Sequence, residues 1–263
     1  MRRVILGACL VLAAAPAAAQ PVRWTDRGYV IVDGAARITS ASFTGVARPV
    51  TFVEPAEVDT SYRVRQAPTL DVAAGARVWR NLAVGADVAF FTRGTTAAVD
   101  AKVPHPFVFG RPRSVSGAAS GLDHTETALN IQARWVMPPT RTRRWQIDLF
   151  GGPSLFVVGQ DVVRDVTITE IYPYDTAAFA GATLDHRSRT HAGFHVGTDV
   201  TRLVARRVAL GVSVSASHAR VDLATADGGS VSLNAGGVQV GLALRFIIPR
   251  KVPAARPPIR RRP

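Results

Sequence analysis

Residues 62–78 read Tyr-Arg-Val-Arg-Gln-Ala-Pro-Thr-Leu-Asp-Val-Ala-Ala-Gly-Ala-Arg-Val, and this stretch decides the fold. Apolar side chains dominate its even positions, whereas its odd positions carry charges and small residues. Successive side chains of a β-strand point to opposite faces of a sheet. The stretch therefore predicts one long strand with an apolar face and a polar face.

The same period of two recurs along the chain. It is found again at 82–90, 126–137, 145–157, 191–201, 208–217 and 237–246. An eighth strand is expected within 37–52, with 30–32 as an alternative start, although its pattern is weaker.

The connections between these strands alternate in length. Short ones at 79–81, 138–144 and 205–206 alternate with longer ones at roughly 53–58, 93–122, 161–188 and 221–230. Short turns on one rim and long loops on the other are typical of an outer-membrane barrel. The sequence therefore predicts an all-β fold, an eight-stranded antiparallel up-and-down transmembrane β-barrel, over residues 20–248.

The composition of the polar face indicates which face lies inside. It is rich in Gly, Ala and Ser, which suits the narrow lumen of an eight-stranded barrel that side chains only just fill. The apolar face would then contact lipid, and opposite charges could pair across the lumen. We expect this lumen charge network to consist of Arg63, Arg65, Asp71, Arg77, Asp87, Glu126, Arg134, Asp148, His195, Asp199 and Arg245.

The first 19 residues have the pattern of a cleaved export signal. Arg2 and Arg3 precede an apolar stretch at 4–15, and three alanines end at Ala19, where we expect cleavage. The single cysteine, Cys9, would be lost with the signal. A mature chain without cysteine suits an oxidising compartment outside the cytoplasm.

The net charge of +13 first suggests a nucleic-acid binder, but its distribution does not. Two arginines belong to the export signal, and six cations lie within the last 14 residues, which leaves +5 for the rest. We expect no nucleic-acid partner. The proline-rich segment 249–263 is interpreted as a disordered basic tail in the periplasm, able to contact anionic headgroups or another polyanion.

No residue pattern makes a convincing catalytic or metal site. His191, His195 and Asp199 share a strand face, but two histidines without further ligands favour a hydrogen-bond network. Ser217 and His218 would point to opposite faces of one strand. Phosphate-loop and dinucleotide motifs are missing, so neither enzyme activity, a cofactor nor a metal is expected.

The last predicted strand, residues 238–246, reads Val-Gln-Val-Gly-Leu-Ala-Leu-Arg-Phe. With the export signal and the paired strands, it resembles the small outer-membrane β-barrels of Gram-negative bacteria, the OmpA-like eight-stranded barrels. The resemblance implies the outer membrane as location, its bilayer as partner, and insertion by the barrel-assembly machinery. In this reading Val240, Leu242, Leu244 and Phe246 form the assembly signal, although residues 247–263 follow the aromatic residue.

The expected function is a structural or narrow porin-like role without catalysis, in a monomer. One alternative is a soluble periplasmic or secreted lipocalin-like barrel that binds a small apolar ligand. Another is an outer-membrane enzyme that modifies lipids. Fold alone does not decide between these functions.

Overall fold

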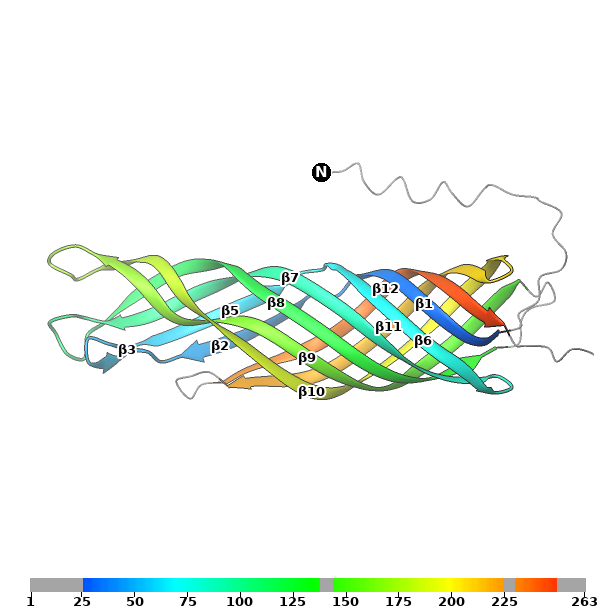
Figure 1. Ribbon diagram of the computed structural model, residues 1–263. Helices are drawn as coiled ribbons and strands as arrows, with labels where there is room; N and C mark the ends of the chain where they lie inside the picture. Colours follow the sequence, from blue (N-terminus) through cyan, green and yellow to red (C-terminus); the bar gives the residue numbers. More distant parts are fainter. Residues whose placement is uncertain (1–25, 138–143, 225–229, 250–263) are drawn as a thin grey trace, which may run out of the picture.

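The computed structural model describes residues 26–137, 144–224 and 230–249. These residues form β-strands joined by short connections (Figure 1). Among them there is no helix that is long and apolar enough to cross a membrane. The export signal, the part of the predicted basic tail after Pro249 and most of the predicted turn at 138–144 lie outside the described residues.

Eight strands close into an antiparallel ring, which confirms the predicted strand number and up-and-down order. Each strand pairs with the next around the ring, and the last pairs with the first. The ring consists of β1 (Asp26–Arg37), β6 (Pro68–Trp79), β7 (Leu82–Pro104), β8 (Pro112–Val136), β9 (Trp145–Glu170), β10 (Ala177–Ala205), β11 (Val208–Ala224) and β12 (Ser230–Pro249).

The prediction of a single strand over 62–78 is wrong. β5 (Glu57–Val64) ends before residues 65–67, and β6 starts at Pro68. A proline has no N–H to donate, so it is tolerated as the first residue of a strand but not within a ladder. The backbone N–H of Arg37 instead bonds the carbonyl oxygen of Ala67 at 3.0 Å.

The first strand of the ring also differs from the main expectation. β1 covers the alternative start at 30–32, whereas β2 (Ala41–Ala47) pairs with β5 outside the ring. At the break between β1 and β2, the hydroxyl of Thr39 accepts a hydrogen bond from the backbone N–H of Val238 at 3.2 Å. Such side-chain bonds compete with strand ladders, and the chain leaves the ring here.

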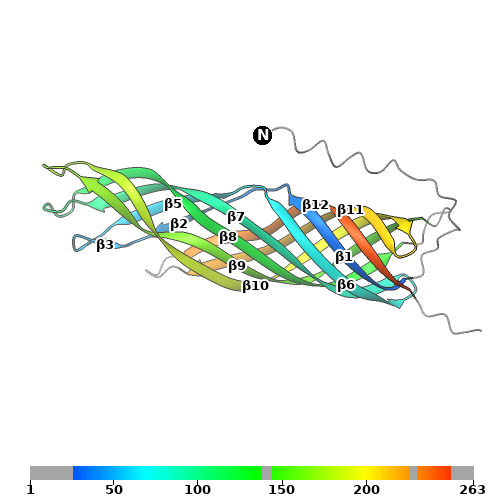
Figure 2. The same cartoon turned by 45° about the horizontal axis from the view of Figure 1, so that its top comes forward.

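The predicted long loops are largely strands. β7 to β10 continue through most of 93–122 and 161–188, which leaves connections at 105–111 and 171–176. β2 and β5 accompany them, and the hairpin of β3 (Val50–Thr51) and β4 (Glu54–Pro55) lies at the same far end (Figures 1 and 2). We call this extension, residues 41–64, 92–125 and 158–189, the tower.

The chemistry of the two faces inverts where the ring passes into the tower. In the lower part of β7, the part nearer the short turn before it, Phe90 is exposed and Asp87 is buried in the lumen. Higher on the same strand and in the same register, Lys102 is exposed and Val99 is buried. The tower thus has an apolar core and a polar surface, whereas the ring has the reverse.

The outside of the ring carries a belt of exposed apolar side chains. It includes Leu70, Val72, Val84, Phe90, Leu129, Ile131, Ile147, Leu149, Leu155, Val157, Phe194, Val196, Val200, Leu210, Val212, Val214, Val240 and Leu242. Trp79, Trp135 and Trp145 are exposed beside the short turns. An outward apolar band with aromatic residues at its edge is the architecture of an outer-membrane β-barrel.

Candidate functional site

The lower lumen, near the short turns, is filled by a buried charge network. Arg134 on β8 pairs with Asp199 on β10 and lies 3.4 Å from Asp148 on β9. Arg245 on β12 also pairs with Asp148, whose second oxygen accepts a hydrogen bond from Gln146 at 2.7 Å. The Asp148 side chain is fully buried, so its charge is balanced within the lumen rather than by water.

Aromatic rings cover this lower network. The guanidinium carbon of Arg245 lies 4.7 Å from the centre of the Tyr29 ring, and that of Arg134 lies 4.4 Å from the Phe150 ring. The rings attract the cations and also occupy the space between them. Tyr29 and both arginines are buried, so the rings and the ion pairs pack together at this level of the lumen.

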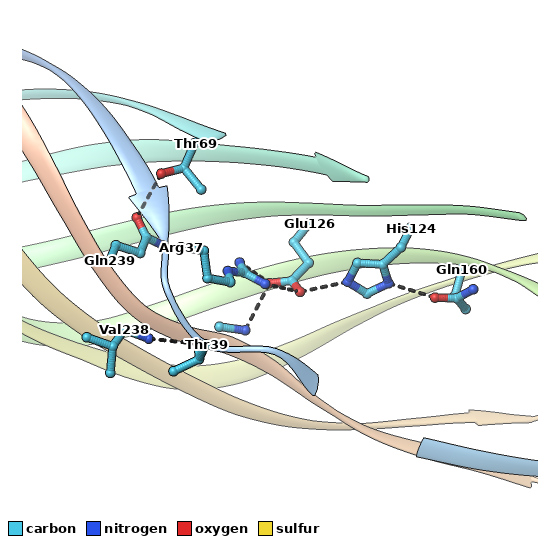
Figure 3. Close-up of polar contacts among 9 residues, drawn as sticks. Arg37, Thr39, Thr69, His124, Glu126, Gln160, Val238 and Gln239 are labelled. Carbon is cyan, nitrogen blue, oxygen red and sulfur yellow. Dashed lines mark hydrogen bonds and ion pairs between the residues drawn. The ribbon is translucent and has the colours of Figure 1, made fainter. Parts of the chain in front are cut away.

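A second buried network crosses the upper lumen (Figure 3). Arg37 on β1 donates two hydrogen bonds to Glu126 on β8, at 2.7 and 2.8 Å. One Glu126 oxygen lies 2.7 Å from Nε2 of His124, whose Nδ1 lies 2.7 Å from the Gln160 side chain. The other oxygen accepts from the backbone N–H of Gly236 at 2.9 Å. Bidentate pairing of this kind fixes both side chains.

A small cavity lies between the two networks. Its lining includes Asp71, Asp87, His195 and Ser217, and it encloses about 30 Å³. That volume holds a water molecule or two but no metabolite. The hydroxyl of Ser154 lies 3.0 Å from Nδ1 of His195, deep in the barrel.

The structure brings most of the expected charge network into the lumen but not all of it. Asp71, Asp87, Glu126, Arg134, Asp148, His195, Asp199 and Arg245 are buried or half-buried on the inner face. Arg77 is half-buried near a short turn and donates to the Arg80 carbonyl at 3.2 Å.

Arg63 and Arg65 correct the expectation, because both are exposed. Arg63 belongs to β5, where the apolar residues Tyr62 and Val64 are buried and the polar face is outside. Arg65 follows in the break after that strand. Both arginines would lie on the inner face only if β5 and β6 formed one continuous strand.

Sequence reasoning missed three members of the upper network. Arg37 stood at the edge of a weakly defined strand, and His124 and Gln160 stood at the edges of predicted loops. The available signal was the alternation itself, since Arg37 shares its inward register with Tyr29 and Ile31.

The candidate catalytic residues do not converge. Ser217 lines the lumen cavity, whereas His218 is exposed and its ring lies 5.9 Å from that of Phe194 on the outer face. Within the described ranges, no group of three side chains is arranged to hold a metal ion.

The residues of the expected assembly signal lie on the strand that closes the ring. Val240, Leu242 and Phe246 are exposed and Leu244 is half-buried. β12 pairs with both β1 and β11 along this stretch. The three exposed side chains therefore form part of the exposed belt.

Comparison with known proteins gives matches among solved structures. No model of a known family matches the chain, and no curated protein matches its sequence. Neisserial surface protein A is 12% identical, with 85% of this chain and 99% of that one covered and a TM-score of 0.40. For OprG from Pseudomonas aeruginosa the values are 8%, 87%, 100% and 0.45. For the outer-membrane protease OmpT from Escherichia coli they are 7%, 84%, 97% and 0.46.

Proposed function

We propose that this outer-membrane barrel is a closed, non-catalytic anchor that holds the tower rigidly outside the bilayer. The observation that carries the proposal is the filled lumen, in which two layers of buried ion pairs enclose a cavity of about 30 Å³. Ions and solutes would have to break a buried ion pair to pass, which costs several kcal/mol. A structural role is therefore favoured over a narrow porin-like path.

The lumen also supports this proposal over the two other functions. A lipocalin-like barrel needs a sizeable apolar cavity, whereas this lumen is polar within the ring and occupied by apolar side chains in the tower. A lipid-modifying enzyme needs its reacting groups where an acyl chain can reach them. The hydroxyl–imidazole pair of Ser154 and His195 is instead buried between the two ion-pair layers.

The tower is the part of the molecule that this anchor would present. Its end is built from the β3–β4 hairpin and the loops 105–111 and 171–176. These are tied together: Gly110 N–H bonds Glu54 at 2.9 Å, and the rings of Phe107 and Tyr174 lie 5.5 Å apart. Loops on a rigid scaffold commonly carry recognition.

The proposal includes three expectations about partners. Insertion would depend on the barrel-assembly machinery reading residues 238–246. The barrel would act as a monomer, since the ring closes on itself and leaves no open edge at the level of the belt. The basic tail would stay on the short-turn side, in the periplasm, where it could meet anionic headgroups.

Planar-bilayer recording of the refolded full chain tests the closed lumen. We expect no conductance steps; steps of a defined size would refute the closed barrel.

Incubation with phospholipid and lipid A tests the non-catalytic role, with His195→Ala as the matched variant. Acyl release by the wild type that this variant abolishes would establish an enzyme instead. If carbonate washed the protein off membranes, it would be a soluble protein and not an integral barrel.

A further inference from the structure

The wall of the barrel has a lateral interruption directly above the belt. β7 pairs with β6 as far as Phe91 and with β5 only from Thr96 onward. Residues 92–95 therefore have no ladder partner on this side, because the neighbouring chain leaves the sheet at 65–67. The break between β1 and β2 lies beside it, since the Gln66 side chain donates to the Ile38 carbonyl at 2.7 Å.

Three arginines line the resulting notch. It has a volume of about 370 Å³ and is lined by Ser40, Arg63, Arg65, Gln66 and Arg93, with no carboxylate in the lining. In the described part of the chain, none of the three arginine side chains makes an ion pair or a hydrogen bond. By contrast, Arg37, Arg113 and Arg134 each pair with a carboxylate. Clustered guanidinium groups without acidic partners repel one another, and an anion between them relieves that repulsion.

The distance of the notch from the top of the belt indicates which kind of anion could reach it. Leu70 and Phe90 face each other in register at the top of the belt, and their exposed fractions are 49% and 47%. Gln66 lies four residues beyond Leu70, and Arg93 lies three beyond Phe90. At about 3.3 Å per residue this is roughly 10–13 Å along the strand, or about 7–9 Å along the membrane normal at a tilt of about 45°. That height corresponds to the headgroup layer outside the hydrocarbon core.

We propose that the notch binds a phosphoryl group of an anionic lipid in the leaflet on the tower side. Guanidinium groups bind phosphate through paired, charge-assisted hydrogen bonds. Ser40 and Gln66 add neutral polar side chains at the same opening. The acyl chains of such a lipid would lie against the belt below Leu70 and Phe90, so one lipid molecule would contact both surfaces. The inference rests on the proposed insertion of the ring into the membrane.

The test uses the refolded full chain in phosphatidylcholine vesicles that contain diphosphoryl lipid A. The barrel is then extracted in mild detergent, and the lipid A that it retains is measured by mass spectrometry. We expect the wild type to retain lipid A and the triple variant R63Q/R65Q/R93Q to retain at least about tenfold less, since several charge-assisted bonds are lost. The triple variant R63K/R65K/R93K should retain an intermediate amount of lipid A, because the positive charges remain but the planar guanidinium groups are lost.

Two controls make the outcomes decisive. Arg164→Gln removes one exposed cation elsewhere in the tower and should leave retention unchanged. Inorganic phosphate at matched concentration should not displace the lipid. Equal retention by the Gln triple variant, or full displacement by inorganic phosphate, would overturn the proposal. If the wild type fails to insert into the vesicles, the proposed function fails; if it inserts and retains no lipid A, only the notch inference fails.

Discussion

Because the polar and apolar faces of β7 invert along its length, replacing each of three alanines by arginine should change the free energy of unfolding by three different amounts. Ala86 lies on the outer face midway between Leu82 and Phe90, a nine-residue stretch that matches a membrane-spanning strand. Ala98 lies on the same outer face within the tower, and Ala97 is fully buried in the tower core. Arginine at these three positions would meet lipid, water and an apolar core respectively.

The expected costs follow from those surroundings. Ala86→Arg places a charge near the bilayer midplane and should cost roughly 2–4 kcal/mol in the free energy of unfolding. Ala98→Arg adds a solvated side chain and should change that free energy by less than about 0.5 kcal/mol. Ala97→Arg buries an unpaired charge and overpacks the core, which should cost several kcal/mol.

Urea titration of the barrel in phosphatidylcholine vesicles, read by the heat-dependent shift on gels and by tryptophan fluorescence, measures all three values. The tryptophans Trp79, Trp135 and Trp145 are exposed beside the short turns and report on insertion. If Ala98→Arg cost as much as Ala86→Arg, the tower would be immersed in lipid and the inversion would be refuted. If Ala86→Arg were neutral, the belt would not face lipid.

Three further predictions follow from buried contacts and can be measured by the same titration. Asp148→Ala leaves two lumen arginines without a shared partner and should cost about 3–5 kcal/mol. Gly241→Ala should cost about 1–3 kcal/mol, because its Cβ would lie 2.7 Å from the Cβ of Ala35, which cannot rotate away, whereas Gly34→Ala, with open space around it, should be neutral. Tyr62→Phe removes the acceptor of the Val163 backbone N–H, at 2.8 Å, and should cost about 1–3 kcal/mol; equal stability would show that water replaces the hydroxyl.

The part of the fold that depends on local alternation was predictable. Residues 82–90 and 208–217 form strands of the ring with the expected faces. The face of each side chain depends on its position along its own strand and not on the residue with which it pairs. The prediction that failed, one strand over 62–78, also alternates without interruption. The break at 65–67 comes from pairing with β7 and β1, which a single stretch of sequence does not contain.

The candidate site likewise combines features that the sequence predicted with features that only the structure shows. Arg134, Asp148 and Asp199 could be assigned to the inner face from their own strands, but their partnership depends on three strands closing around one axis. Arg63 and Arg65 were assigned to the wrong face because the inward positions change from even to odd at the break at 65–67. That break depends on how β5 and β6 pair with β7, which the alternation does not contain.

By itself, the sequence determined that the chain is all-β, that its strands have two unlike faces, and that eight of them close a ring. Alternation encodes the strands and their faces because each residue's face is set by its immediate neighbours, and the alternating short and long connections indicated the up-and-down ring. Only the tertiary structure decided that the strands continue into a tower, that the polar and apolar faces exchange roles there, and that three unpaired arginines meet at a gap in the wall. Those features arise from pairing between distant segments, such as β5 with β7, and from the change of solvent along one strand.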